Sequence, residues 1–161
     1  MTDVCEPPEV DWKVLVIDDQ PDMLEVTQLV FDSLEFDGRS VTVLTASSSR
    51  EARAIVDRVQ DIAVAYVGVV METEHAGLDF VRHVREDLGN HHMRLILRTG
   101  NPGAASREHV VHELEIDDYR EKPELTADRL ETSLLTSLRA YRRLCECCGS
   151  PGRCRLGPTD S

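Results

Sequence analysis

Short apolar runs that stop at polar residues constrain the fold of this chain more than any other feature of its sequence. Lys13–Ile17 is rich in Val, Leu and Ile and is followed by two aspartates, and Arg94–Arg98 is followed by Thr-Gly. Ile62–Met71 is apolar almost throughout. Such runs are typical of buried parallel strands. The segments between them, such as Leu24–Leu34, have apolar residues at helical spacing. Strands and helices therefore alternate, which predicts an α/β parallel sheet with right-handed crossovers.

The same patterns place the individual elements along the chain. We expect a single domain without a substantial output domain, because 161 residues suffice for one buried core. The expected strands lie near residues 13–17, 41–45, 63–68, 94–98 and 116–120. The expected helices lie near residues 21–35, 48–59, 77–88, 104–113 and 126–144.

Several polar residues follow or end the expected strands. Asp18 and Asp19 follow the first, Thr99 closes the fourth, and Lys122 with Pro123 follows the fifth. Open parallel sheets bind ligands outside the carboxyl ends of their strands. We therefore expect these residues to meet in one crevice, together with the glycine that closes the third strand.

These residues and their order resemble the receiver domain of two-component response regulators, over roughly residues 12–144. The resemblance implies a flavodoxin-like, doubly wound, five-stranded parallel sheet of order 2-1-3-4-5 with helices on both faces. It also implies roles for the strand endings: two acidic residues hold Mg²⁺, a Thr and an aromatic form a switch, and a Lys contacts phosphate. The residues that match these roles are Asp18, Asp19, Thr99, Tyr119 and Lys122.

Gly68 departs from this family at its central residue. Receivers close the third strand with an aspartate that accepts a phosphoryl group from a histidine kinase. The strings Val69–Leu78 and Arg98–Gly103 resemble a receiver subgroup in which the residue before Val-Val is Asp. Glycine offers no oxygen for nucleophilic attack or for metal coordination. We therefore expect an atypical receiver with no catalytic acceptor at Gly68 and with weakened Mg²⁺ binding at Asp18 and Asp19.

Other interpretations of the acidic residues stay open. Glu72, Asp18 or Asp19 can in principle replace the missing acceptor, although none looks well placed. Aspartates after a strand are also common helix N-caps, and Asp19 or Asp22 is a candidate cap for the helix that follows Pro21.

Charge and hydropathy exclude several partner classes. The formal net charge of −12 disfavours nucleic acid, because phosphate backbones are repelled. No run of about 20 apolar residues is present, and the first residues do not resemble a signal peptide. We expect a cytoplasmic protein that does not contact membranes, with an N-terminal extension (1–11), a receiver domain (12–144) and a Cys-rich tail (145–161).

The tail holds a cluster of thiols. Its cysteines are Cys145, Cys147, Cys148 and Cys154. In a cytoplasmic chain such a cluster suggests zinc or another metal, or reversible oxidation, although the spacing is not that of paired C-x-x-C units. An unstructured tail is the simpler interpretation. Likewise, Glu72–Ala76 with His91 and His92 can be read as metal ligands or, more simply, as solvated loops.

The last expected helix suggests how the chain meets its partners. Apolar residues recur at helical spacing from Leu130 to Leu144, with Arg139, Arg142 and Arg143 on the opposite side. In receivers the face between the fourth and fifth helices mediates dimerisation or docking. We expect a stand-alone, non-enzymatic signalling module in a phosphorelay that binds a sensor histidine kinase or another signalling protein, and that forms a homodimer through this face. The alternatives are phosphorylation on another carboxylate, or a metal or redox sensor in the tail.

Overall fold

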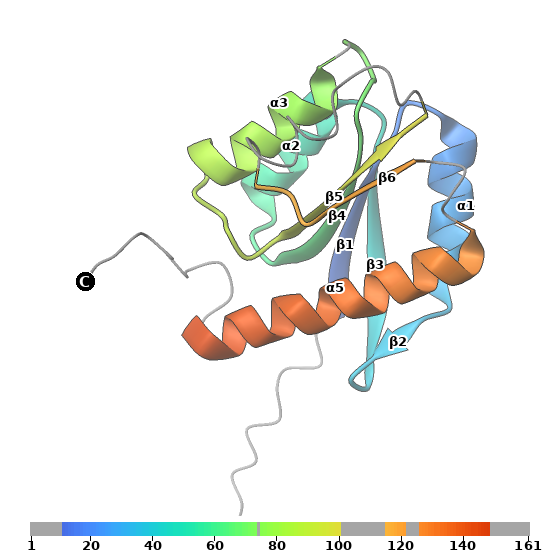
Figure 1. Cartoon of the computed structure of the whole chain (residues 1–161), viewed down its shortest axis with the longest axis vertical. Coiled ribbons are helices and arrows are strands. Elements are labelled where there is room, and N and C mark those ends of the chain that lie inside the picture. The colour runs from blue at the N-terminus through green and yellow to red at the C-terminus, as the bar shows by residue number, and fades with distance from the viewer. Residues whose placement is uncertain (1–10, 74, 101–114, 122–125, 149–161) are drawn as a thin grey trace, which may run out of the picture.

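The computed structural model describes residues 11–73, 75–100, 115–121 and 126–148. The expected fourth helix (104–113), Lys122 and Cys154 lie outside these ranges. The element labels below are those of Figure 1.

A mixed sheet forms the centre of the fold (Figure 1). In the described ranges it has six strands in the order β2-β3-β1-β4-β5-β6. The strands are β1 (Trp12–Ile17), β2 (Glu35–Phe36), β3 (Arg39–Ala46), β4 (Ile62–Gly68), β5 (Arg94–Thr99) and β6 (Asp118–Glu121). The four pairs that join β3, β1, β4, β5 and β6 in this order are all parallel, and these five strands reproduce the expected order 2-1-3-4-5. This confirms the flavodoxin-like class; the expected number of strands was one too few.

The additional strand β2 forms an antiparallel hairpin with β3 at the edge of the sheet. Its turn is Asp37-Gly38, and both residues have a positive φ, of 56° and 75°. Asp-Gly is typical of the two-residue turns that require this conformation. The helix expected over 21–35 therefore ends earlier: α1 spans Pro21–Asp32, and the chain then enters the hairpin.

Helices cover both faces of the sheet. The helices α1 and α5 (Ala127–Cys148) lie on one face, and α2 (Ser49–Arg58) and α3 (Ala76–Arg82) lie on the other (Figure 1). The helix expected over 77–88 changes character midway, because α3 continues as a π-helical turn over His83–Asp87. The last helix extends to Cys148, beyond its expected end at residue 144. No helix within the described segments has the length and apolar character to cross a membrane.

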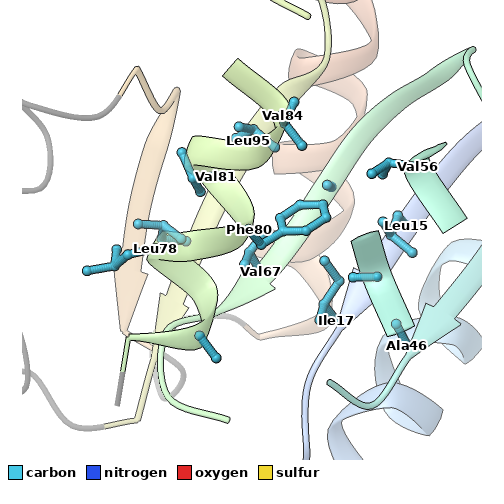
Figure 2. Close-up of a cluster of buried hydrophobic side chains, with 14 of the residues drawn as sticks. Leu15, Ile17, Ala46, Val56, Val67, Leu78, Phe80, Val81, Val84 and Leu95 are labelled. Atoms are coloured by element: carbon cyan, nitrogen blue, oxygen red, sulfur yellow. The ribbon is translucent and has the colours of Figure 1, made fainter. Parts of the chain in front are cut away.

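Alternation along the strands divides the core into two layers. Leu15, Ile17 and Val67 face α2 and α3, where Phe80 of α3 lies among them (Figure 2). Val14, Val16, Tyr66 and Ile96 face the other way, toward α1 and α5. This period of two decides where the residues at the carboxyl ends of the strands point.

Candidate functional site

The carboxyl ends of β1, β4 and β5 bring three of the expected site residues to one edge of the sheet. Asp18 follows β1 and is fully buried, whereas Asp19 is exposed. Gly68 is the last residue of β4, and a Cβ built on it would lie 3.7 Å from Asp18 Oδ2. Thr99 is the last residue of β5 and is buried. These strand endings therefore lie at the same edge of the sheet, as the parallel order requires.

Asp18 is held by hydrogen bonds at both its backbone and its side chain. Its N–H donates to the carbonyl of Ala46 at 3.1 Å, and its Oδ1 accepts from the N–H of Gln20 at 3.0 Å. The N-cap position of α1 belongs to Gln20, so the interpretation of Asp19 or Asp22 as the cap was wrong. Asp22 lies in the first turn of the helix, where a carboxylate interacts favourably with the helix dipole.

Arg98 is the site residue that the sequence reasoning missed. It is the penultimate residue of β5, pairs in register with Gly68, and is fully buried. Its Nη2 lies 3.8 Å from Asp18 Oδ2, and its Nη1 donates to the hydroxyl of Thr27 in α1 at 3.0 Å. The signal was present in the sequence: an arginine at the end of Leu95-Ile96-Leu97 is a charge in a strand that is otherwise buried, and charged residues are almost never fully buried unless paired.

The guanidinium of Arg98 is shielded from water. Burial lowers the pKa of the Arg98 guanidinium, and the charge of Asp18 and then the ring of Tyr66 partly offset this. The guanidinium stays protonated, because arginine side chains do not lose their proton in proteins. Within the described ranges, its Nε and Nη2 have no hydrogen-bond partner. The contact with Asp18 is therefore electrostatic, and Thr27 fixes its geometry.

A second glycine shapes the same edge. Gly77, at the start of α3, donates its N–H to the carbonyl of Val69 at 3.0 Å. A Cβ at position 77 would lie 2.1 Å from the carbonyl oxygen of Gly68, so only glycine lets the helix begin this close to the strand end. At Gly68 itself the space is larger, since the tightest contact of a Cβ would be 3.3 Å, to the carbonyl oxygen of Ile17. An aspartate there requires a shift of a few tenths of an ångström.

Glu72, a candidate substitute acceptor, is engaged elsewhere. Its two carboxylate oxygens accept the backbone N–H groups of Ser49 and Arg50 at 2.8 and 3.1 Å, at the start of α2. Burial acts to raise the pKa of Glu72, but these backbone hydrogen bonds outweigh it and hold the pKa below its ordinary value. The carboxylate thus anchors the loop after β4 to α2.

The two expected switch residues lie on neighbouring strands. Tyr119 of β6 is buried in the layer that also contains Phe80, and it pairs in register with Leu97 of β5. Thr99 pairs in register with Glu121, two positions further along both strands. Their assignment as a switch stays a prediction.

The donor set at this edge fits a divalent cation poorly. Mg²⁺ prefers an octahedron of oxygen ligands that includes one or two carboxylates. Asp18 and Asp19 supply carboxylates, but Gly68 adds no side-chain oxygen. In addition, the positive guanidinium of Arg98 lies 3.8 Å from one of these oxygens.

The other candidate metal ligands do not gather in the parts of the chain that the structure describes. No group of three or more His, Cys, Asp or Glu side chains there is arranged to hold a metal. His91 Nδ1 lies 2.6 Å from Glu115 Oε2, and His92 is buried, which lowers its pKa.

The first tail cysteines continue the last helix. Cys145, Cys147 and Cys148 lie in α5, so the boundary expected at residue 145 falls within this helix. Cys145 is a free thiol, half-buried against the layer under α5, and burial raises its pKa. A raised pKa disfavours the thiolate that metal binding and oxidation require.

A groove runs between α5 and the β6 edge. Its volume is about 590 Å³. Its lining combines hydroxyl groups of α5 with charges of both signs: Arg94, Asp117, Asp118, Arg120, Asp128, Arg129, Thr132, Ser133, Thr136, Ser137 and Ala140. Ser133 also connects the groove to the buried layer, because its hydroxyl lies 2.9 Å from that of Tyr66.

Comparison with known proteins shows a relative in sequence. No protein-family model matches the chain. The chain is 49% identical over 134 residues to the 3'3'-cGAMP-specific phosphodiesterase 2 of Vibrio cholerae serotype O1. The match covers 83% of this chain and 26% of the relative, so the chain spans about a quarter of the length of the curated relative that it matches.

Solved receiver domains are similar in structure. A response regulator receiver domain protein from Clostridium thermocellum is 26% identical, with a TM-score of 0.67 over 83% of this chain and 98% of that chain. The signal receiver domain of an HD domain-containing protein from Pseudomonas fluorescens Pf-5 is 18% identical, with a TM-score of 0.72 over 84% and 93%. The chain therefore has the fold of the receiver domains of two-component response regulators, as its motifs predicted.

Proposed function

We propose that this chain is a receiver-like signalling module that acts by protein–protein contact and is not phosphorylated at position 68. The observation that carries the proposal is Gly68, the last residue of β4 and the position that bears the acceptor aspartate in the family. Phosphoryl transfer depends on an ionised nucleophile in line with the phosphorus. Glycine supplies none.

The surroundings of the other carboxylates support the proposal. The Glu72 carboxylate is occupied by two backbone N–H groups of α2. Asp18 is buried beside the Arg98 guanidinium, so it lacks the exposure that an acceptor needs. Asp19 is exposed, and it does not lie at position 68, where the family carries its acceptor. A misplacement of about 1 Å can already cost about 10²-fold in rate.

The proposed contact surface is the face formed by α5 and β6. Its groove offers charges of both signs and several hydroxyls, which can pair with polar groups of a protein partner. The module would be non-enzymatic, and its partner would be a sensor histidine kinase, another signalling protein or a second copy of the chain. The expected contribution of the fourth helix lies outside the described residues.

The likeness to part of a cyclic-dinucleotide phosphodiesterase suggests a further partner class. That relative is about four times as long as the matched region, and it is named as a phosphodiesterase specific for 3'3'-cGAMP. We propose that a phosphodiesterase of this class is a partner whose output the module influences. Catalysis itself is not assigned to this chain.

Exposure to acetyl phosphate with Mg²⁺ tests the proposal. Intact-mass spectrometry of the chain should show no added phosphoryl group, while Gly68→Asp under the same conditions should gain one. A phosphoryl adduct on the unmodified chain, mapped by peptide mass spectrometry to Glu72, Asp18 or Asp19, would overturn the proposal in favour of a displaced acceptor.

A further inference from the structure

We propose that Arg98 is a built-in counter-ion that takes the place of a divalent cation at the site formed by Asp18, Asp19 and Gly68, called the pocket below. The pocket would then reach its final form without metal. This inference goes beyond the proposed function, because protein binding without an acceptor does not determine which positive charge neutralises Asp18.

The order of the strands brings Arg98 to Asp18. Asp18 follows β1 and Arg98 lies in β5, with β4 between them. Strands two positions apart are separated by about 10 Å, so the two side chains have to meet above β4. There β4 ends in Gly68, which has no side chain. Two residues earlier, Tyr66 lies beneath the guanidinium, with its ring centroid 5.6 Å from Arg98 Cζ.

Burial makes the two charges depend on each other. The side chains of Arg98 and Asp18 are 0% and 1% exposed. A charge removed from water in this way is strongly destabilising unless a partner compensates it. The hydrogen bonds from Arg98 to Thr27 and from Gln20 to Asp18 hold the partners in this geometry.

A metal ion at Asp18 would compete with this arrangement. Its positive charge would lie within a few ångströms of the guanidinium, and like charges at that range repel strongly in a poorly solvated site. Mg²⁺ would have to displace Arg98 into solvent or bind Asp19 alone. Removal of the guanidinium should therefore improve metal binding.

The direction in which the melting temperature changes in Asp18→Asn tests whether Arg98 is the counter-ion of Asp18. In the presence of EDTA, Asp18→Asn should lower the melting temperature by roughly 10 °C, because it leaves a buried guanidinium without its counter-ion. The matched control Asp19→Asn removes an exposed carboxylate and should change the melting temperature by no more than about 2 °C. An acidic site that awaits a metal behaves in the opposite way, since loss of one carboxylate relieves repulsion. An unchanged or raised melting temperature for Asp18→Asn would overturn the inference.

Titration with Mg²⁺ tests whether Arg98 takes the place of a metal ion. The backbone amide of Gln20 donates to Asp18, so its NMR shift reports on the pocket. Arg98→Met should bind Mg²⁺ at least about tenfold more tightly than the unmodified chain. Arg98→Lys keeps the charge and should show no comparable gain. Equal Mg²⁺ affinities in the unmodified chain and Arg98→Met would contradict the inference. The melting temperatures of Asp18→Asn and Asp19→Asn provide a separate test that does not require the Arg98 variants to fold.

These results are independent of the proposed function. Phosphorylation of the unmodified chain by acetyl phosphate would overturn the proposed function alone. A melting temperature for Asp18→Asn that does not fall would overturn the counter-ion role of Arg98 alone.

Discussion

Asp18 and Arg98 belong to strands that are not neighbours, and they approach to 3.8 Å above the glycine that ends the strand between them. This contact relates the absence of an acceptor carboxylate at Gly68 to the pairing of Asp18 with a positive side chain. An aspartate at position 68 would extend toward Asp18, since its Cβ would already lie 3.7 Å from Asp18 Oδ2. Glycine at position 68 thus supplies no second carboxylate beside Asp18, whereas Arg98 supplies a positive charge 3.8 Å from Asp18 Oδ2.

Gly77→Ala should be strongly destabilising. Its Cβ would lie 2.1 Å from a backbone oxygen of Gly68, and neither the strand end nor the start of α3 can move away cheaply. We expect the free energy of unfolding in urea to fall by more than about 3 kcal/mol.

Gly89→Ala is the matched control for that change. Gly89 has a φ of 62°, but a Cβ there would meet nothing within 4 Å. The loss should be confined to backbone strain of about 1 to 2 kcal/mol. Equal losses for the two variants would contradict the close approach of α3 to Gly68.

Tyr66→Phe should cost about 1 kcal/mol in the free energy of unfolding. The change removes the hydroxyl that lies 2.9 Å from that of Ser133, at the base of the α5 groove. Ser133→Ala removes the other partner, so urea unfolding of both single variants and the double variant gives the coupling between them. Additive losses would mean that this hydrogen bond contributes nothing to stability.

Arg142→Ala should loosen the β2-β3 hairpin. Arg142 Nη1 lies 3.3 Å from Asp37 Oδ2, and its guanidinium lies 5.1 Å from the ring centroid of Phe36. Loss of both contacts should lower stability by about 1 kcal/mol and speed amide hydrogen exchange in the hairpin. Arg143→Ala removes an exposed arginine from the next position and serves as the control. Equal exchange rates in the two variants would contradict the contact.

Acid should weaken the anchor that Glu72 provides. The pKa of Glu72 is lowered from 4.5 in the folded chain, so its carboxylate stabilises the fold at pH values above 4.5. That stabilisation is lost as the pH falls below 4.5 and through the lowered folded-state pKa. Glu72→Gln should therefore be less stable than the unmodified chain at pH 7 and should approach it in acid. A stability difference that does not shrink in acid would contradict this role.

Much of the fold could be predicted because the strand endings carry a strong local signal. The apolar runs that stop at Asp18, Gly68 and Thr99 are strands β1, β4 and β5 in the structure, and the parallel order follows. The hairpin was missed although Asp37-Gly38 marks it, because helical spacing in α1 continued through Leu34 and outweighed the turn signal.

The counter-ion could not be derived from spacing along the chain. Arg98 meets Asp18 only because β4 lies between their strands and ends in a residue without a side chain, which is a property of the assembled sheet. The engagement of Glu72 depends in the same way on the loop after β4 lying over the start of α2. Local patterns therefore placed the strand endings, and tertiary contacts decided which charges meet there.

Beryllofluoride with Mg²⁺ tests the central claim most directly, because this phosphoryl analogue requires the acceptor carboxylate. The amide of Gln20 is a suitable NMR reporter, since it contacts Asp18. Trp12, the natural fluorophore, lies at the far end of β1, roughly 20 Å away at about 3.3 Å per residue, and packs on Phe36. We predict that the Gln20 amide of the unmodified chain does not shift when beryllofluoride is added, and that the same amide in Gly68→Asp does. A saturable shift in the unmodified chain would contradict a pocket without an acceptor.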